Sequence, residues 1–277
     1  MIRLAVRCSK EDSESVLAAL LDLAPNGVEE DLDGEFVEFA IYGAPGEVPD
    51  LGAVEAASGS GLVEVTTTEI PDDWADRWTD FHRPIEVADR LRVRPSWFER
   101  EGDWEDVVID PGRAFGTGAH ATTRMCLELL VSLQESGEAT GSIADWGAGS
   151  GVLAIAAARL GWSPVAACDS EEAAIKATEA NAKANAVEVS AIRVNVREES
   201  PPSASTVVAN LTAPLLSACA RWIEEPPRVM ACSGLLVSEL DGAAAMLSDV
   251  GLYEAQRRTS GDWGALLLRS DLASTAT

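Results

Sequence analysis

Residues 142–151 (Ser-Ile-Ala-Asp-Trp-Gly-Ala-Gly-Ser-Gly) constrain the fold more than any other stretch of this chain. Their apolar start predicts a short buried strand, and the apolar residues 152–160 predict a helix that ends at Gly161. Glycines between a strand and a helix let the backbone approach a ligand closely, and the first amides of the helix then point at that ligand. The sequence therefore predicts a ligand-binding turn, with a plain strand–turn–helix connection as the alternative.

The glycine spacing distinguishes between two kinds of ligand. A dinucleotide-binding turn has the pattern G-x-G-x-x-G, whereas here glycines occupy positions 147, 149 and 151 and position 152 is Val. With Asp145 two residues ahead, this G-x-G-x-G pattern resembles the first motif of Rossmann-like methyltransferases that use S-adenosylmethionine (SAM). The resemblance implies that Asp145, Gly147 and Gly149 contribute to a site for the methionine part of SAM. Val152 argues against a nicotinamide cofactor.

A second strand is predicted at residues 164–169, where an apolar run ends in Asp169, and a helix is predicted at 171–185. Asp169 follows Asp145 by 24 residues, a spacing that suits one strand–helix–strand unit. An acid at the end of the second parallel strand can accept hydrogen bonds from both ribose hydroxyls. Asp169 is therefore a candidate ribose ligand. Capping of the next helix is the alternative role, and the two roles are compatible.

The remaining C-terminal sequence completes a seven-stranded α/β sheet. Further strands are predicted at 187–194, 206–209 and 228–232, a helix at 238–250, and an antiparallel hairpin at 252–257 and 264–269. Asn210 follows one of these strands, on the carboxyl side of the sheet, where ligands bind in open α/β folds. This fold class, with the SAM motif, resembles a Rossmann-like class I SAM-dependent methyltransferase.

The N-terminal residues predict a separate small domain. Strands are predicted at 2–8, 28–32, 35–42 and 62–70, and helices at 11–24 and 47–58. The order βαββαβ is that of a ferredoxin-like α+β domain, which we place at residues 1–70. It carries no catalytic constellation. We expect either a scaffold or a docking surface that recognises a substrate protein.

Residues 71–97 are predicted to link the two domains, so that the methyltransferase domain covers 98–277. Trp74 and Trp78 are spaced i,i+4, which places them on one face of a connecting helix. Two short strands are expected at 85–87 and 91–93.

Residues 109–123 contain a loop with three glycines, a proline and Phe115, a composition that packing alone does not require. Such a loop is a candidate lid over a ligand. Thr122 or Thr123 is expected to cap the helix predicted at 124–133, and to offer a hydroxyl to the ligand. His120 is interpreted as a structural loop histidine.

The same loop carries a longer resemblance. From Asp110 to Thr123 the sequence reads D-P-G-x-A-F-G-T-G-x-H-x-T-T, which resembles the signature of the ribosomal-protein methyltransferase family PrmA. That family methylates amines of the eleventh protein of the large ribosomal subunit. Further matching positions lie upstream and downstream, at Trp78, Phe81-His82, Pro95-Ser96-Trp97, residues 145–151, Asp169 and Asn210-Leu211. The resemblance covers about residues 70 to 270, and the N-terminal domain is similar in plan only.

The resemblance implies a role for each matching residue. Thr123 and Gly147 line the SAM site, Asp169 holds the ribose, Asn210 closes the pocket near the methyl group, and Phe115 lies in the covering loop. It also implies a ribosomal protein, free before assembly, as the partner, with lysine side chains or the N-terminal amine as methyl acceptors. We expect a monomer. Three mild departures, at Trp146, Ala148 and Thr212, affect none of these contacts.

Asn210 is the candidate catalytic residue. Its amide carbonyl can accept a hydrogen bond from an amine and direct the lone pair of that amine at the methyl group. Methyl transfer mainly needs alignment at about 3–3.5 Å and exclusion of water. The amine must be neutral, and no His or Cys of the sequence suggests a base. The alternative for Asn210 is a turn residue that caps the next helix.

The net charge of the chain limits the classes of partner that it can bind. Its 277 residues hold 46 acids against 21 Lys plus Arg, a net charge of −25, which disfavours direct nucleic-acid binding. Either a basic protein partner or a high-salt cytoplasm accounts for such a surface, and the even spread of acids favours salt. If so, the melting temperature rises between low and molar KCl.

Other bulk features point to a soluble, cytoplasmic protein. No apolar run is long enough to cross a bilayer, and no signal-peptide pattern is present. The five cysteines show no C-x-x-C pair, and with only two histidines no metal site is predicted. We interpret the cysteines as small buried apolar residues.

Other functions remain as alternatives. Enzymes that methylate Gln or nucleobase amides usually have Asn/Asp-Pro-Pro-Tyr where this chain has Asn210-Leu211-Thr212, which argues against that group. A lysine methyltransferase for another protein stays open. So does a SAM-binding regulator or assembly factor without turnover, against which the intact Asn210 and the loop glycines argue.

Overall fold

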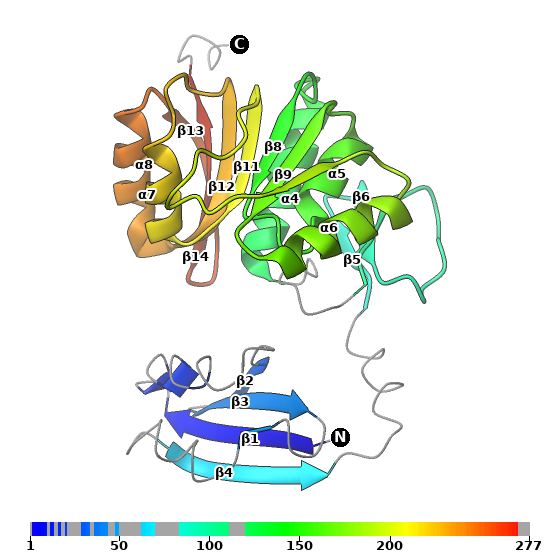
Figure 1. Cartoon of the computed structure of the whole chain (residues 1–277), viewed down its shortest axis with the longest axis vertical. Helices are drawn as coiled ribbons and strands as arrows, with labels where there is room; N and C mark the ends of the chain where they lie inside the picture. The colour runs from blue at the N-terminus through cyan, green and yellow to red at the C-terminus, as the bar shows by residue number, and fades with distance from the viewer. Residues whose placement is uncertain are drawn as a thin grey trace. The chain divides into compact units, whose positions relative to one another are not determined.

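A computed structural model describes residues 2–9, 12–13, 16–17, 20, 29–33, 36–43, 48–49, 62–69, 83–110 and 120–270. The chain forms two compact units, Met1–Phe81 and His82–Thr277 (Figure 1). Within the described part, no helix has both the length and the apolar character that crossing a membrane requires.

The first unit contains a four-stranded antiparallel sheet in the order β2-β3-β1-β4. Its strands are β1 (Ile2–Ser9), β2 (Glu29–Asp33), β3 (Phe36–Gly43) and β4 (Leu62–Glu69). This is the strand order of a ferredoxin-like sheet, which agrees with the predicted plan. The alternating residues Leu4, Val6 and Cys8 are buried in one cluster with Val16 and Leu20, which lie in the predicted first helix. Nearly all of the second predicted helix, 47–58, lies outside the described residues.

The second unit is built on a seven-stranded sheet in the order β10-β9-β8-β11-β12-β14-β13, and this confirms the predicted fold class. Strands β8 to β12 are parallel, and β14 is antiparallel to both β12 and β13. The strands are β8 (Ile143–Trp146), β9 (Val165–Asp169), β10 (Ser190–Arg193), β11 (Thr206–Asn210), β12 (Val229–Leu236), β13 (Tyr253–Ser260) and β14 (Trp263–Arg269). The third predicted strand is thus shorter than expected.

Helices cover both faces of this sheet (Figure 1). One face packs against α4 (Ala121–Glu135), α5 (Val152–Leu160) and α6 (Glu172–Ala184). The other packs against α7 (Ala213–Ala220) and α8 (Leu240–Ser248), and a 3₁₀ turn, η2 (Val237–Glu239), precedes α8.

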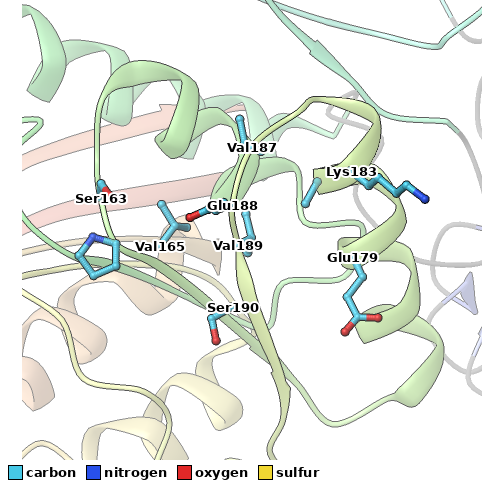
Figure 2. Close-up of a pocket in the computed structure, with 10 residues that line it drawn as sticks. Ser163, Val165, Glu179, Lys183, Val187, Glu188, Val189 and Ser190 are labelled. Carbon is cyan, nitrogen blue, oxygen red and sulfur yellow. The ribbon is translucent and has the colours of Figure 1, made fainter.

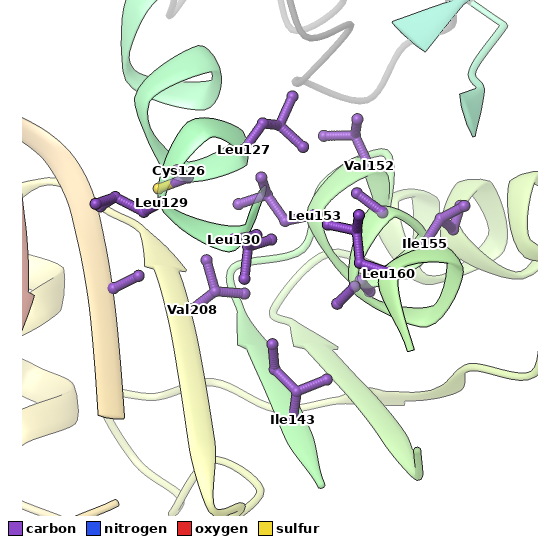
Figure 3. Packing of buried hydrophobic residues seen from close by; sticks show 14 of the residues in the cluster. Cys126, Leu127, Leu129, Leu130, Ile143, Val152, Leu153, Ile155, Leu160 and Val208 are labelled. Carbon is purple, nitrogen blue, oxygen red and sulfur yellow. The ribbon is translucent and has the colours of Figure 1, made fainter. Parts of the chain in front are cut away.

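Two of these helices, α4 and α5, are buried on most of their surface. Figure 3 shows Leu127 and Leu130 of α4 against Leu153 of α5, above Ile143 of β8 and Val208 of β11. A helix that is apolar almost all round is stable only inside a core, and this explains why α5 is buried. Gly161, with φ +113°, ends α5 as predicted.

The strand order reverses at β8, because β9 and β10 extend the sheet to one side and β11 and β12 to the other. In open α/β sheets the crevice for a ligand forms at this point, at the carboxyl ends of the strands. Gly147 follows β8 directly, Asp169 ends β9, and Asn210 ends β11. The fold therefore brings these three predicted site residues to one edge of the sheet.

Residues 85–97 differ from the predicted linker. β5 (Ile85–Val87), β6 (Leu91–Arg94) and β7 (Glu105–Val108) form a small sheet in the order β5-β6-β7. Val87, Leu91, Val93 and Val107 are buried in the same core as α4 and α5, so these strands belong to the second unit. The strand β7 was not predicted because two of its four residues are acidic and it has no apolar alternation.

A cluster of charged residues closes the end of the sheet opposite the glycine turn. Glu138 follows α4 and accepts hydrogen bonds from Arg269 of β14, at 2.5 and 2.8 Å, and from Arg228, at 2.9 Å. These hydrogen bonds, above all those from Arg269, lower the pKa of Glu138 from 4.5 to about 2. One carboxylate therefore links three segments that are far apart in the sequence.

We expect Glu138→Gln to lower the free energy of unfolding at neutral pH. Because the folded-state pKa is depressed, the contribution of Glu138 is present above pH 4.5 and is lost as the pH falls toward about 2. Urea unfolding at a series of pH values measures the difference between wild type and variant, which should shrink on the acid side. Glu172→Gln is the matched control because Glu172 makes only an exposed pair with Lys176, at 2.6 Å. Equal effects of the two substitutions would contradict this account.

Candidate functional site

The predicted ligand-binding turn has the backbone that its glycines allow. Gly147, Gly149 and Gly151 have φ values of +79°, +54° and +80°, a region that residues with a Cβ rarely adopt. A Cβ on Gly151 would also lie 2.8 Å from Cγ2 and 3.1 Å from Cα of Thr178. The turn is anchored because the amides of Gly147 and Ala148 both donate to the carbonyl of Cys168, at 2.9 and 3.0 Å. The glycines are therefore required by the geometry of the turn.

Helix α6 holds the turn from behind. The Thr178 hydroxyl donates to the carbonyl of Gly149 at 3.2 Å, and Asn181 Nδ2 donates to the carbonyl of Ser150 at 2.8 Å. Neither residue was singled out from the sequence. The signal was weak but present, since these polar residues lie at or beside the face of α6 that also buries Ala174 and Ala182.

A third residue that the sequence analysis missed is Asn185, just past the end of α6. It is only 1% exposed, and its side-chain amide pairs with the backbone of Val108 in both directions, at 2.7 Å each. Val108 ends β7, the strand that leads into the loop at 109–123. Asn185 therefore fixes the base of this loop against the helix that supports the glycine turn. Phe115, the predicted covering residue, lies outside the described residues.

Asp169 connects the turn to the start of α6. Its Oδ2 accepts from the amide of Gly149 at 3.0 Å, and its Oδ1 accepts from the amide of Glu171 at 3.0 Å. The alternative prediction, that Asp169 caps the next helix, is wrong: the N-cap of α6 is Glu171, and Asp169 accepts from the amide of that cap residue. Asp169 also lies beside the glycine turn, as a ribose ligand must. Ribose binding itself stays a prediction.

The structure brings Thr123 and Asn210 together across 87 positions of sequence. Asn210 Nδ2 donates to Thr123 Oγ1 at 3.1 Å, and Thr123 is 1% exposed. The next helix, α7, has Thr212 at its N-cap with no side-chain hydrogen bond, so Asn210 does not cap it. Among the described residues, no donor contacts the carbonyl oxygen of Asn210. That oxygen is available at the carboxyl edge of the sheet.

The predicted cap of α4 is wrong. The helix begins at Ala121 and its N-cap is His120, whose Nδ1 accepts from the amide of Thr122 at 3.4 Å and lies 2.8 Å from the Thr122 hydroxyl. The ring of His120 also packs edge-on against Trp263, with centroids 5.1 Å apart. Thr123 does not cap the helix because it lies within the first turn, where its hydroxyl meets Asn210. The structural role predicted for His120 fits these contacts.

Asp145 lies beneath the turn rather than in it. The residue is 1% exposed, and its Oδ2 accepts from the amide of Ala154 at 3.1 Å. Burial raises the pKa of Asp145 to about 7; the Ala154 amide opposes this rise, and the negative charge of Asp169 adds to it. The site thus holds two carboxyl groups at the ends of adjacent strands, an environment that favours a cationic ligand over a pyrophosphate.

A groove lies away from these residues. Figure 2 shows a groove of about 660 Å³ that is lined by Ser163 and Val165 at the start of β9, by Lys183 of α6, and by Val189 before β10. These are the amino ends of the strands, whereas the glycine turn, Asp169 and Asn210 lie at the carboxyl ends. The groove is therefore separate from the candidate site.

The residues at the carboxyl edge fit the cofactor that their pattern predicts. Glycine backbone at the turn allows close approach, Asp169 offers carboxylate oxygens beside it, and the acids suit a sulfonium cation. In the described part of the chain, no group of three or more His, Cys, Asp or Glu side chains is placed to hold a metal ion. All five cysteines are free and buried, as interpreted from the sequence.

Comparisons with known proteins show the family to which the chain belongs. The family model described as "Ribosomal protein L11 methyltransferase (PrmA)" matches residues 46–271. A protein of Pelotomaculum thermopropionicum named ribosomal protein L11 methyltransferase is 37% identical over 211 residues, which is 74% of this chain and 68% of that protein. One of the same name from Desulforamulus reducens is 32% identical over 227 residues, 77% of this chain and 72% of that protein.

A solved structure of a protein with the same described activity also matches this chain. The crystal structure of ribosomal protein L11 methylase from Lactobacillus delbrueckii subsp. bulgaricus matches with a TM-score of 0.61 and 25% sequence identity. The match covers 68% of this chain and 98% of that one. Family model, relatives and structure agree, and the chain belongs to the ribosomal protein L11 methyltransferase (PrmA) family.

Proposed function

We propose that this protein transfers methyl groups from SAM to amino groups of ribosomal protein L11. The observation that carries the proposal is the pairing of Asn210 with Thr123 beside the glycine turn, at the reversal point of the sheet. Membership of the family supports the activity and the substrate. The finer assignment, to lysine side chains or the N-terminal amine, is our proposal.

The cofactor would be held by the backbone of Gly147 and Gly149 and by the carboxylate of Asp169. When bound, SAM would supply a methyl group on a positively charged sulfur. A neutral amine can attack the carbon of this methyl group, and the carbon–sulfur bond then breaks to leave a neutral thioether. Asn210 is proposed to accept a hydrogen bond from that amine through its carbonyl oxygen, while its Nδ2 stays bound to Thr123 at 3.1 Å. This contact fixes the rotation of the amide, so that the oxygen faces the incoming amine.

The acceptor amine must reach the site without its extra proton. A lysine amine has a pKa near 10.4, so at neutral pH only a small fraction is neutral in water, and desolvation in the site increases that fraction. Neither His120 nor any cysteine serves as a base, because His120 is held as the cap of α4 and the cysteines are buried. The proton is therefore proposed to leave to solvent.

The first unit and the charge of the chain suggest how the substrate docks. We propose that the ferredoxin-like domain, placed at residues 1–70, recognises the free ribosomal protein before assembly. A net charge of −25 would attract a substrate that presents lysine amines. Adaptation to high salt remains the other explanation of this charge. We propose that the protein acts in the cytoplasm as a monomer.

Mass spectrometry of the substrate tests the proposal. Unmethylated L11, free or assembled in ribosomes, is incubated with the protein and SAM, and the product is weighed and fragmented. We expect methyl increments on amines of free L11 only. Methylation of an unrelated lysine-rich protein but not of L11 would favour a different lysine methyltransferase. SAM binding without any methyl transfer would favour a non-catalytic factor.

A further inference from the structure

The carboxyl group of Asp145 lacks the partners that a buried charge needs. The residue is 1% exposed, its Oδ2 accepts one hydrogen bond, from Ala154, and its buried Oδ1 has no hydrogen-bond partner in the described structure. Transfer of an ionised carboxylate into such a place is strongly unfavourable without a cation or further hydrogen-bond donors. The empty site therefore favours the uncharged acid.

The titratable groups around Asp145 come from three other elements. Cys126 of α4 and Cys168 of β9 interact with Asp145 electrostatically, and Cys126 interacts in turn with Cys232 of β12. Among the described residues, the one charged neighbour is Asp169 at the end of β9. Burial raises the pKa of each of these thiols, which keeps them neutral at physiological pH. No Lys, Arg or His of the described residues contributes to the titration of Asp145. The surroundings thus add negative charge and no positive charge.

We propose that Asp145 distinguishes SAM from its demethylated product: the carboxyl group is protonated in the empty site and releases its proton to solvent when a sulfonium occupies the site. This inference rests on the proposed SAM site. The methionine ammonium and carboxylate are common to SAM and to S-adenosylhomocysteine, so the charge on sulfur is the difference between the two ligands. In low dielectric that charge stabilises an ionised carboxylate nearby.

Two consequences follow for the binding cycle. SAM affinity rises with pH through the titration of Asp145, because binding and proton release are linked. The affinity for the product depends on pH less steeply, since the product brings the methionine ammonium but no charge on sulfur. After methyl transfer Asp145 takes a proton back, and the site loses the interaction that held the substrate form of the cofactor.

Calorimetry of the full-length protein measures the linked proton directly. SAM, S-adenosylhomocysteine and a stable analogue with an ammonium in place of the sulfonium are titrated at pH 7, in two buffers of different ionisation enthalpy. Burial raises the pKa of Asp145 to about 7, so a share of the empty molecules carries this proton at the pH of the titration. We expect a larger proton release with the two ligands that carry the additional positive charge than with the product.

Two variants test whether the proton released on SAM binding comes from Asp145. Asp145→Asn should abolish the difference in proton release between SAM and the product. Asp249→Asn removes an exposed carboxylate at the end of α8 and should leave the difference as in wild type. If Asp145→Asn does not fold, the difference in proton release between SAM and S-adenosylhomocysteine in the wild-type protein still tests the proposal.

The empty protein gives an independent measurement. The pKa of Asp145 is raised from 3.8 to about 7 on folding, so its contribution to stability is full below pH 3.8 and is lost as the pH rises through 7. Asp145→Asn should remove this part of the pH dependence. Equal proton release with SAM and product, or an unchanged difference in Asp145→Asn, would overturn the inference. Failure to methylate L11 would contradict the proposed function but not the role of Asp145. Absence of any SAM binding would overturn both the proposed function and the role of Asp145.

Discussion

Replacing Asn210 with alanine is expected to lower kcat by about 100-fold or more, and to change the dissociation constant of SAM by only a few-fold. The reason is that the proposed hydrogen bond joins Asn210 to the acceptor amine, and a hydrogen bond made at the reacting group typically contributes about 10²–10³ to kcat. The cofactor, by contrast, would be held mainly by the glycine turn and Asp169, which the substitution leaves in place.

Steady-state methyl transfer to L11, with calorimetric titration of SAM, separates the two effects. Thr123→Val is the informative companion, because it removes the hydroxyl that accepts from Asn210 Nδ2 at 3.1 Å and keeps the side-chain shape. Thr123→Val lets the side-chain amide of Asn210 rotate but leaves this amide in place. We therefore expect an intermediate loss of kcat, about tenfold. Equal losses of turnover and SAM affinity in Asn210→Ala would show that the residue acts in cofactor binding instead.

The sequence predicted the parts of the site that depend on local spacing. The glycine turn, the helix that ends at Gly161, and the acids at the ends of β8 and β9 all lie within residues 142–169, where short-range pattern decides the structure. Asn210 could be placed at the sheet edge for the same reason. Its contact with Thr123 was not predictable from the pattern, because it depends on how α4 packs across the sheet.

The parts that were missed depend on tertiary contacts. β7 carries two acids in four residues, and it forms a strand because Asp106 lies buried between Arg92 and Arg94, at 3.0 and 2.7 Å. No periodic pattern records such a pairing. Asn185 likewise looks like an ordinary residue at a helix end, whereas its side chain satisfies the backbone of Val108, 77 positions away.

Another residue that the sequence analysis did not single out, Gly234, leads to the other large expected effect. Gly234 has φ +85° and forms a bulge in β12, between Ser233 and Leu235. A Cβ there would lie 2.6 Å from the carbonyl oxygen of Leu211, 2.8 Å from its carbonyl carbon and 2.9 Å from its nitrogen. These are backbone atoms that cannot rotate away. Leu211 follows Asn210 directly, and its amide donates to the Ser233 carbonyl at 2.9 Å.

Gly234→Ala should therefore destabilise the protein by about 2–4 kcal/mol, the sum of a strained positive φ and an overpacked contact. It should also reduce kcat in the molecules that stay folded, since the segment that carries Asn210 must shift. Urea unfolding and methyl-transfer kinetics measure the two effects separately. Gly242→Ala is the matched control: Gly242 lies in α8 with nothing within 4 Å of its added Cβ, so alanine there should be neutral or stabilising by up to about 1 kcal/mol.

If Gly234→Ala proved as stable and as active as Gly242→Ala, the close approach of β12 to Leu211 would not be what positions Asn210. A loss of stability with unchanged kcat would instead mean that the chain relieves the contact on the β12 side, away from the site. A loss of kcat with SAM affinity preserved would give the same pattern as Asn210→Ala. That pattern would show that the bulge acts through Asn210, because Gly234 itself has no side chain with which to contact the cofactor or the amine.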